Sequence, residues 1–192
     1  MTCPLFHVEP VTWRAPDPEN YDALLLTSAN AIRHGGTELA KLNALPVQAV
    51  GSATAAAAHE AGFRIEGVGA ADVADLLAQL SPMLRLLHLA GEDHRDTDDP
   101  RVHRQIVYRS AAIDDPGLPP LERLVTAVHS PRAGTRLAEL AVIREATAIA
   151  AISTAAAAAC GDGWQRLEVA DRPNDNSLLA LAARLCHTMS PE

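Results

Sequence analysis

Residues 22–31 read Asp22-Ala-Leu-Leu-Leu-Thr-Ser28-Ala-Asn-Ala31, a short apolar run that breaks into a turn of small and polar residues. The same layout returns farther along the chain as Val125-Thr-Ala-Val-His-Ser130-Pro-Arg-Ala133. A second pair keeps the order: Ala49-Val-Gly51-Ser-Ala-Thr54 precedes Gly62-Phe63, and Ala151-Ile-Ser153-Thr-Ala precedes Gly163-Trp164. The paired segments predict two similar α/β lobes with a cleft between them, each presenting hydroxyls and amides where a strand gives way to a helix.

Apolar runs and helical segments alternate along most of the chain, which predicts parallel sheets wound on both faces. We expect strands at Ala23–Leu26, Val47–Val50, Phe63–Val68, Leu84–Leu89, Gln105–Arg109, Val125–His129, Ala148–Ile152 and Arg166–Val169. We expect helices from Asn30 through Leu42 with Ser28 as N-cap, from Ser52 to Gly62, and over Ala71–Leu80, Ala133–Leu140, Ala155–Ala159 and Ser177–Cys186, the last capped by Asn176 or Ser177. Pro10 limits the segment Pro4–Trp13 to an edge or linker strand.

Composition narrows the class of protein. A chain of 192 residues with 48% apolar residues can bury a core as one domain or two small ones. The formal net charge of −8 argues against nucleic acid or an anionic membrane as a partner. No apolar run approaches the ~20 residues that cross a bilayer, and the start lacks the pattern of a secretory signal, so we expect a cytoplasmic protein.

The cysteines and histidines predict no metal site. Cys3, Cys160 and Cys186 are an odd number without CxxC spacing, which is typical of free thiols in a reducing compartment. His94 and His103 flank an Asp-rich loop, but this spacing fits a solvated loop better than a set of metal ligands.

Small residues directly follow the expected strands, and they are candidates for binding an anion. They are Thr27-Ser28, Gly51-Ser52-Ala53-Thr54, Gly91, Ser130 and Ser153-Thr154. Unpaired amides and the helix dipole favour carboxylate or phosphate at such positions, and ligands of wound parallel sheets bind beyond the carboxyl ends of the strands. The alternative is that these serines and threonines only cap helices. The sequence contains no GxSxG, no GxGxxG and no phosphate loop, which disfavours a generic nucleotide-binding protein.

Several arginines are candidate ligands for an anionic substrate. They are Arg85, Arg95, Arg101, Arg104 and Arg109, with Arg132 in the other lobe. Of these we favour Arg109 and Arg132. The alternative for each is a solvated surface charge paired with a carboxylate such as those in Glu92–Asp99.

A series of short motifs stands in one order along almost the whole chain. They are Pro4-Leu-Phe-x-Val-Glu-Pro-Val, Leu26-Thr-Ser-x-Asn-Ala31, Ala49-Val-Gly-x-x-Thr-Ala55, Leu87-x-Leu-Ala-Gly91, Val107-Tyr-Arg109, His129-Ser-Pro-Arg-Ala133, Ile152-Ser153, Gly163-Trp164, Val169-Ala-Asp-Arg-Pro173 and Ser177-Leu-Leu-Ala180. Each is short and unspecific alone. Together they resemble the uroporphyrinogen-III synthase family, in its alphaproteobacterial form.

The resemblance implies two α/β lobes joined by a two-stranded connector. Mapped onto this chain, residues 1–13 and 105–110 are the connector strands, 14–104 the inserted lobe and 111–192 the terminal lobe. The family usually opens with a further β-α unit, so we expect the terminal lobe to be incomplete at its N-terminal strand.

The implied activity is the cyclisation of hydroxymethylbilane, a linear tetrapyrrole, to uroporphyrinogen III in haem biosynthesis, with loss of water and inversion of ring D. The bilane loses hydroxide to give an azafulvene, which ring D attacks to form a spiro intermediate that fragments and recloses. No cofactor is implied. We expect a monomer that binds a small-molecule polycarboxylate, and the resemblance allows a transient contact with hydroxymethylbilane synthase.

The resemblance also assigns roles to residues. Tyr108 matches the connector tyrosine, a candidate hydrogen-bond donor to the leaving hydroxide, although it could instead only pack. Ser28 and Thr54 match the hydroxyl positions of one lobe and Ser130 and Ser153 those of the other. Gly51, Ser52 and Ala53 would offer amides, and Thr154 supplements Ser153 because Ala156 replaces the family's threonine. The open alternatives are a non-catalytic tetrapyrrole-binding or anion-binding module and an inactive truncated synthase.

Overall fold

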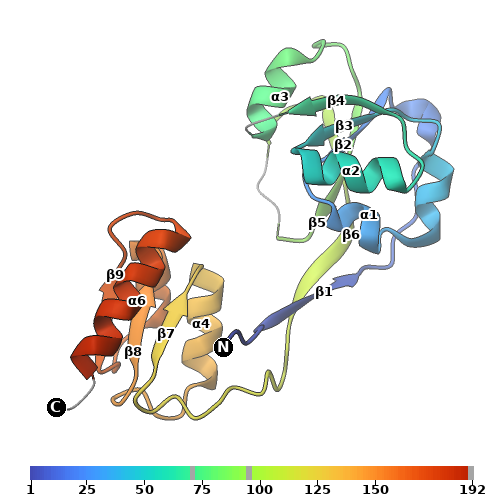
Figure 1. Cartoon of the computed structure of the whole chain (residues 1–192). Coiled ribbons are helices and arrows are strands. Elements are labelled where there is room, and N and C mark those ends of the chain that lie inside the picture. Colours follow the sequence, from blue (N-terminus) through green and yellow to red (C-terminus); the bar gives the residue numbers. More distant parts are fainter. Residues whose placement is uncertain (70–71, 94–96, 190–192) are drawn as a thin grey trace. The chain divides into compact units, whose positions relative to one another are not determined.

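Two sheets organise the protein in the computed structural model, which describes residues 1–69, 72–93 and 97–189 (Figure 1). One compact unit comprises Phe6–Ala111, and the other comprises Met1–Leu5 together with the chain from Ala112 onward. The parallel α/β architecture predicted from the sequence is confirmed. The cleft between the lobes stays a prediction.

The first unit contains a six-stranded sheet in the order β1-β6-β5-β2-β3-β4. Its strands are β1 (Phe6–Pro10), β2 (Ala23–Leu26), β3 (Val47–Val50), β4 (Ile65–Gly69), β5 (Leu86–Gly91) and β6 (Val102–Ala112). Strands β6, β5, β2, β3 and β4 pair in parallel along this order. The sheet therefore gathers the carboxyl ends of β5, β2 and β3 at one edge.

Strand β1 lies at the edge of this sheet, beside β6. The amide of Val11 donates to the carbonyl of Val107 at 3.1 Å, and the amide of Ile113 donates to the carbonyl of Leu5 at 3.0 Å. Residue numbers that fall on one strand as they rise on the other indicate antiparallel pairing. Pro10 is compatible with this edge position, as the sequence predicts.

Alternation along β2 shows how the sheet is covered on both faces. Leu24 and Leu26 belong to a core cluster that includes residues of α1 (Asn30–His34), the 3-10 helix η2 (Gly36–Leu42) and α2 (Ser52–Glu60). Ala23 and Leu25 belong to the cluster on the opposite face, with Leu76 and Leu77 of α3 (Val73–Gln79). A short 3-10 helix, η1 (Pro18–Asn20), precedes β2. Successive side chains of a strand point to opposite faces, and here both faces are covered. The strand is therefore apolar throughout.

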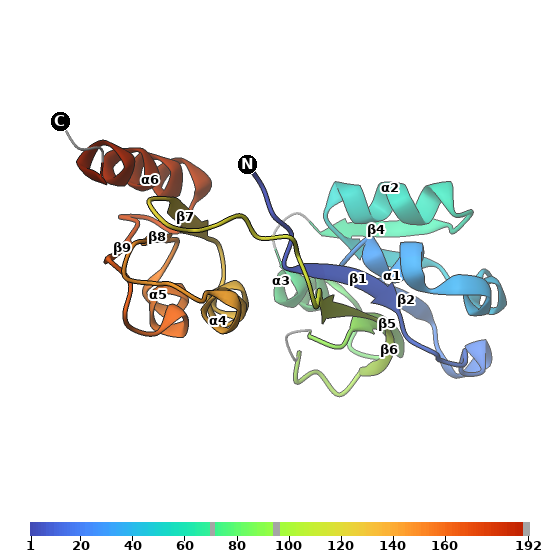
Figure 2. The same cartoon turned by 90° about the horizontal axis from the view of Figure 1, so that it is seen from below.

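The second unit contains a three-stranded parallel sheet in chain order: β7 (Val125–Val128), β8 (Ala148–Ala151) and β9 (Arg166–Val169). Helices α4 (Pro131–Leu140) and α5 (Thr154–Cys160) pack on one face, and α6 (Asp175–Met189) packs on the other (Figure 2). A Cβ atom at Gly134 of α4 would lie 2.8 Å from the carbonyl oxygen of Ala156 and 3.0 Å from Cys160 Sγ. Only glycine allows α4 and α5 to approach this closely.

Some predicted helix boundaries are wrong. The helix expected from Asn30 through Leu42 is two elements, because α1 ends at His34 and η2 follows Gly35 and Gly36, the latter at φ +65°. The N-cap of α1 is Ala29 and not Ser28, although Ser28 Oγ accepts a hydrogen bond from the Asn30 amide at 3.2 Å. The cap of α6 is Asn174, whose Oδ1 accepts from the Ser177 amide at 3.0 Å. Ala71, the predicted start of α3, lies outside the described residues.

Candidate functional site

The first unit places candidate residues side by side at the carboxyl edge of its sheet. Strands β6, β5, β2 and β3 are consecutive neighbours, and the register pairs Leu26 with both Leu89 and Ala49. Tyr108 lies on β6, and Gly91, Ser28 and Gly51 stand at or just beyond the ends of β5, β2 and β3. Residues far apart in the sequence therefore form one row at the end of the sheet where parallel α/β proteins bind ligands.

A β-bulge determines where Tyr108 points. Ala90 pairs with Ile106, but Gly91 pairs with Tyr108, so Val107 is the extra residue on β6. In a regular strand Val107 and Tyr108 would lie on opposite faces. Beyond the bulge they share a face, and both contact the core cluster that contains the β2 leucines and Ala31 of α1. Bulges beside active sites commonly redirect a side chain in this way.

Gly91 provides the space into which the Tyr108 ring is redirected. A Cβ atom at residue 91 would lie 2.6 Å from Tyr108 Cε2, 2.7 Å from Cζ and 3.0 Å from the hydroxyl oxygen. The tyrosine ring therefore lies directly across the glycine. The ring is half-buried, and its centroid is 6.4 Å from that of His34, with 38° between the ring planes. A phenol held in this way can donate a hydrogen bond from a fixed position.

The N-terminus of α2 has no side-chain cap. Its N-cap is Gly51, at φ +81°, and the space around a Cβ at that position is open. The Gly51 amide donates to the carbonyl of Gly69 at 2.8 Å, so Gly51 shapes the turn and does not offer its own amide. The amides of Ser52 and Ala53 belong to the first turn, which has no intrahelical acceptors, and both residues are exposed. Such a terminus favours an anion.

Thr54 differs from the other predicted hydroxyl residues. Its side chain is buried, at 6% exposure, within the helix face that covers the sheet. Ser28 is half-buried at the end of β2. The neighbouring Thr27 hydroxyl lies 3.0 Å from Nε2 of His88, a buried histidine of β5 that the sequence reasoning missed. A polar residue inside an otherwise apolar strand is the signal that marks His88.

The second unit also carries polar groups at the carboxyl ends of its strands, where two serines cap helices. Ser130 Oγ accepts from the Ala133 amide and Ser153 Oγ from the Ala156 amide, each at 3.2 Å. Because the register pairs Val128 with Ala151, both caps stand at the same edge of the sheet. A hydroxyl that accepts from an amide still has its own proton to donate. Thr154 is exposed at the first position of α5, and His129 Nε2 lies 3.5 Å from Asp175 Oδ1.

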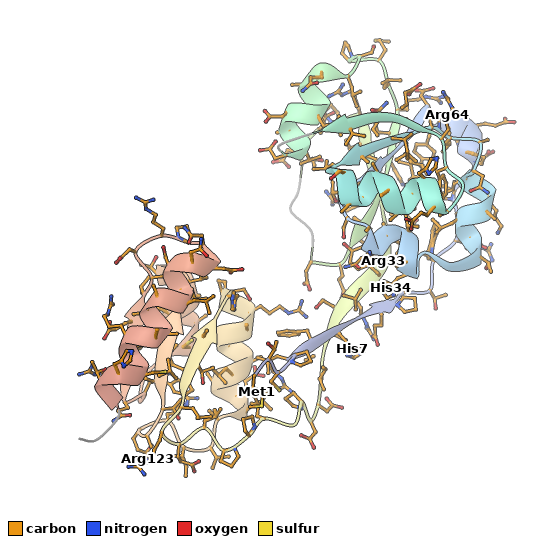
Figure 3. The ribbon with its side chains drawn as sticks, in the orientation of Figure 1. Met1, His7, Arg33, His34, Arg64 and Arg123 are labelled. Atoms are coloured by element: carbon orange, nitrogen blue, oxygen red, sulfur yellow. The ribbon has the colours of Figure 1, made fainter. Side chains whose placement is uncertain are left out.

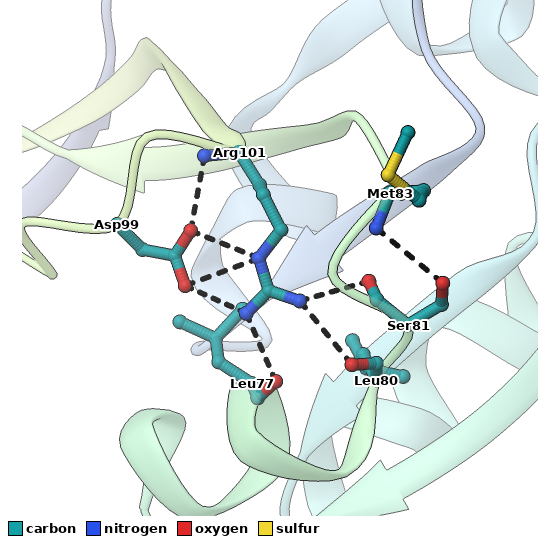
Figure 4. Close-up of polar contacts among 6 residues, drawn as sticks. All are labelled: Leu77, Leu80, Ser81, Met83, Asp99 and Arg101. Carbon is teal, nitrogen blue, oxygen red and sulfur yellow. Dashed lines mark hydrogen bonds and ion pairs between the residues drawn. The ribbon is translucent and has the colours of Figure 1, made fainter.

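Arg101 and Arg85 each bind a carboxylate of the first unit. Arg101 binds the Asp99 carboxylate, at 2.7 Å for the shortest bond, and donates to the carbonyls of Leu77, Leu80 and Ser81 (Figure 4). It therefore joins the end of α3 to the start of β6. Arg85 binds both carboxylate oxygens of Asp22 and holds the pKa of that carboxyl at about 2.

The two favoured arginines differ in their environment. Arg109 Nε donates to Glu9 Oε1 at 2.6 Å; this hydrogen bond raises the pKa of Arg109 and lowers that of Glu9. Arg132 is exposed at the start of α4, and Arg104 is half-buried on β6. Arg95 and His94 lie outside the described residues. The His103 ring centroid is 5.7 Å from that of Tyr21. Within residues 1–69, 72–93 and 97–189, no three His, Cys, Asp or Glu residues gather as metal ligands.

Together these features define a class: an α/β protein with two parallel sheets whose carboxyl ends carry helix amides, serine hydroxyls and a phenol, which are groups that can bind an anion. The family model described as Uroporphyrinogen-III synthase HemD matches residues 1–180, and the chain belongs to this family. Members are lyases of porphyrin biosynthesis.

The fold is shared with a solved structure. Uroporphyrinogen-III synthetase from Helicobacter pylori 26695 superposes with a TM-score of 0.69 at 18% identity, over 94% of this chain and 91% of that one. Uroporphyrinogen III synthase from the extremely thermophilic bacterium Thermus thermophilus aligns with a TM-score of 0.44 at 16% identity, over 97% of this chain and 89% of that one. A comparison with curated protein sequences found no match.

Proposed function

We propose that the chain cyclises hydroxymethylbilane to uroporphyrinogen III, with loss of water and inversion of ring D, and that Tyr108 acts in the first step. Family membership supports the reaction. The observation that carries the site is the placement of Tyr108 across Gly91, at the carboxyl edge of the six-stranded sheet. The bulge on β6 and the glycine opposite it fix the position of the phenol.

The substrate is a polycarboxylate, and both units offer groups that suit it. Ser52 and Ala53 present the uncapped amides of α2, and Ser130 and Ser153 present hydroxyls at the ends of β7 and β8. We assign Ser28, Thr154, Arg109 and Arg132 to the same task. Amides, hydroxyls and guanidinium groups bind carboxylates through directed hydrogen bonds, which an acidic protein can supply locally despite its overall charge of −8.

The chemistry needs little from the protein beyond position. The C–O bond of the hydroxymethyl group breaks, and the pyrrole nitrogen of the same ring supplies the electron pair that stabilises the carbon. The Tyr108 hydroxyl donates a hydrogen bond to the departing oxygen and so stabilises the charge that develops there. Ring D then attacks through its substituted carbon, and the spiro intermediate fragments and recloses.

Binding must also choose between two products. The free bilane cyclises spontaneously to the uninverted isomer I, so the catalyst must hold ring D where only the substituted carbon reaches the electrophile. Fixing the carboxylate side chains at several points restricts the bilane to such a conformation, and positioning of this kind accounts for large rate effects.

Two further features of the proposal concern setting and assembly. We assign the protein to the cytoplasm, because three cysteines without CxxC spacing are typical of a reducing compartment, and we expect it to be a monomer. A transient encounter with hydroxymethylbilane synthase would deliver the unstable substrate. In the part of the chain that the structure describes, no helix has the length and apolar character to cross a membrane.

The test is a coupled assay. Hydroxymethylbilane is generated in situ, the protein is added, the products are oxidised, and porphyrin isomers I and III are separated by chromatography. Isomer III above the protein-free blank supports the proposal. Isomer I alone, together with saturable binding of the bilane, would instead identify a non-catalytic tetrapyrrole-binding module.

A further inference from the structure

We propose that His34 donates the proton that converts the departing hydroxide of the substrate to water, next to the hydrogen bond from Tyr108. The inference rests on the proposed function and concerns residues of the first unit alone. It gives a role to a side chain that neither the sequence motifs nor the row of helix N-termini singles out.

Position is the first argument. His34 is the last residue of α1 (Figure 3), and the centroid of its ring is 6.4 Å from that of the Tyr108 ring. Aromatic pairs in contact span ~4.5–7 Å, so the two side chains are neighbours. The phenol and the imidazole form no hydrogen bond with each other. In the proposed arrangement the hydroxymethyl oxygen of the substrate lies between them and contacts both.

The segment that follows α1 fixes His34 in place. Trp13 Nε1 donates to the carbonyl of Gly35 at 2.8 Å, and Glu38 Oε2 accepts from the Ala15 amide at 2.7 Å. A Cβ atom at Gly35 would lie 2.6 Å from the carbonyl oxygen of Ala31, so the chain turns tightly here. These contacts hold the histidine where the ring meets Tyr108.

Freedom of the ring nitrogens is the second argument. Among the residues that the structure describes, none accepts a hydrogen bond from the His34 ring or forms an ion pair with it. The ring is half-buried, so part of it meets solvent. A structural histidine of a core is usually satisfied by a protein partner. The ring of His34 has no such partner, so its nitrogens can bind a ligand.

The surrounding charged groups are engaged elsewhere or lie on other faces. On β1, His7 and Glu9 bind each other, and Glu9 binds Arg109, on the face of β6 opposite to Tyr108. On η2, Glu38 binds Lys41 at 2.6 Å. His88 of β5 is buried against Thr27, Arg33 precedes His34 on α1, and His59 and Glu60 end α2.

The proposed step balances without a further reagent. An imidazolium N–H proton moves to the hydroxymethyl oxygen as the C–O bond breaks, which gives water, an azafulvenium cation and neutral imidazole. When the last pyrrole regains aromaticity after ring closure, it releases one proton, which restores the imidazolium. Imidazole is suited to this cycle because its charge changes between pH 5 and 8.

The test uses preformed hydroxymethylbilane, so that no second enzyme contributes its own pH dependence. kcat/KM for isomer III, after subtraction of spontaneous cyclisation, is measured from acid to mildly alkaline pH for the wild type and for His34→Phe. Phenylalanine preserves an aromatic contact with Tyr108 but has no proton to transfer. We expect a loss of roughly 100-fold and a flat alkaline limb, where the wild type loses rate as the imidazolium deprotonates.

His59→Gln is the matched control, because it removes an exposed imidazole in the last turn of α2, at the end opposite to the amides of Ser52 and Ala53. It should keep the wild-type rate and profile. Thermal unfolding verifies that each variant folds. If His34→Phe does not fold, His34→Gln is assayed in its place. A His34 variant that retains both the wild-type rate and the alkaline limb overturns the inference. A wild type that forms no isomer III refutes the proposed function instead.

Discussion

Tyr108 lies across Gly91, with its Cζ atom 2.7 Å from the position that a Cβ at residue 91 would take. The relationship depends on the bulge at Val107, which places a second side chain of β6 on the face that α1 covers. If Gly91 acts by making room for the Tyr108 ring, a substitution of Gly91 should change activity only while that ring is present.

Gly91→Ala should lower isomer III production by at least ~10-fold, because the methyl group forces the phenol away from its position. The Tyr108→Ala background provides the control. If the methyl acts by displacing the ring, Gly91→Ala should have little further effect once the ring is gone. Equal losses in both backgrounds would show that Gly91 acts independently of Tyr108. Steady-state assays of the wild type, the two single variants and the double variant complete this cycle.

Ser130 offers a way to separate capping from substrate binding. Ser130→Ala removes the acceptor for the Ala133 amide and should destabilise the protein by about 1 kcal/mol, as seen by urea unfolding. Ser130→Asp preserves the cap but places a negative charge where a carboxylate of the substrate would bind. We expect the aspartate variant to keep its stability and to raise KM by ~10-fold or more. An unchanged KM would leave Ser130 with its structural role only.

The Asp22–Arg85 pair predicts a specific response to acid. Hydrogen bonds from Arg85 lower the pKa of Asp22 to about 2, below the value of ~3.9 for an unfolded aspartate. A carboxyl with a lower pKa in the folded state adds stability above the unfolded pKa, and this stability is lost as the pH falls toward 2. Asp22→Asn should therefore unfold at lower urea than the wild type at pH 7.

That difference should shrink as the pH falls from 4 toward 2, because the wild-type carboxyl is then protonated as well. Ionic screening by added salt should reduce it at neutral pH, since the pair is exposed. A difference between the two proteins that stays constant from pH 7 to pH 2 would contradict the assigned cause of the pKa shift.

Local sequence patterns predict most of the strands and several helix caps of this protein. Most of the features that they do not predict depend on how distant segments pair. The short segments Ala23–Leu26, which is apolar, and Arg166–Val169, in which charged and apolar residues alternate, are strands with the predicted bounds. Ser130 and Ser153 precede their helices as caps, which depends only on neighbouring residues. The Gly35-Gly36 pair separates α1 from η2, and this pair of glycines is a sequence signal that could have predicted the break.

Features that depend on register were not predictable in this way. Nothing local to Tyr108 indicates that β6 contains a bulge, because a bulge is a property of two strands. Two hydrogen bonds likewise depend on segments distant in the sequence. The Gly51 amide donates to the carbonyl of Gly69, and Arg101 donates to the carbonyl of Leu77 in α3. His34 acquires its significance only from the ring that the fold places beside it.

Comparison of Tyr108→Phe with the wild type tests the central claim most directly. Both proteins are given preformed hydroxymethylbilane, and the initial rate of isomer III formation is measured beside the melting temperature. We predict that the phenylalanine variant loses roughly 10-fold or more in rate, which corresponds to one hydrogen bond to a developing charge, while its melting temperature stays near that of the wild type. A variant that matches the wild-type rate, or that loses stability and activity in parallel, would contradict the assignment of Tyr108 to the reaction.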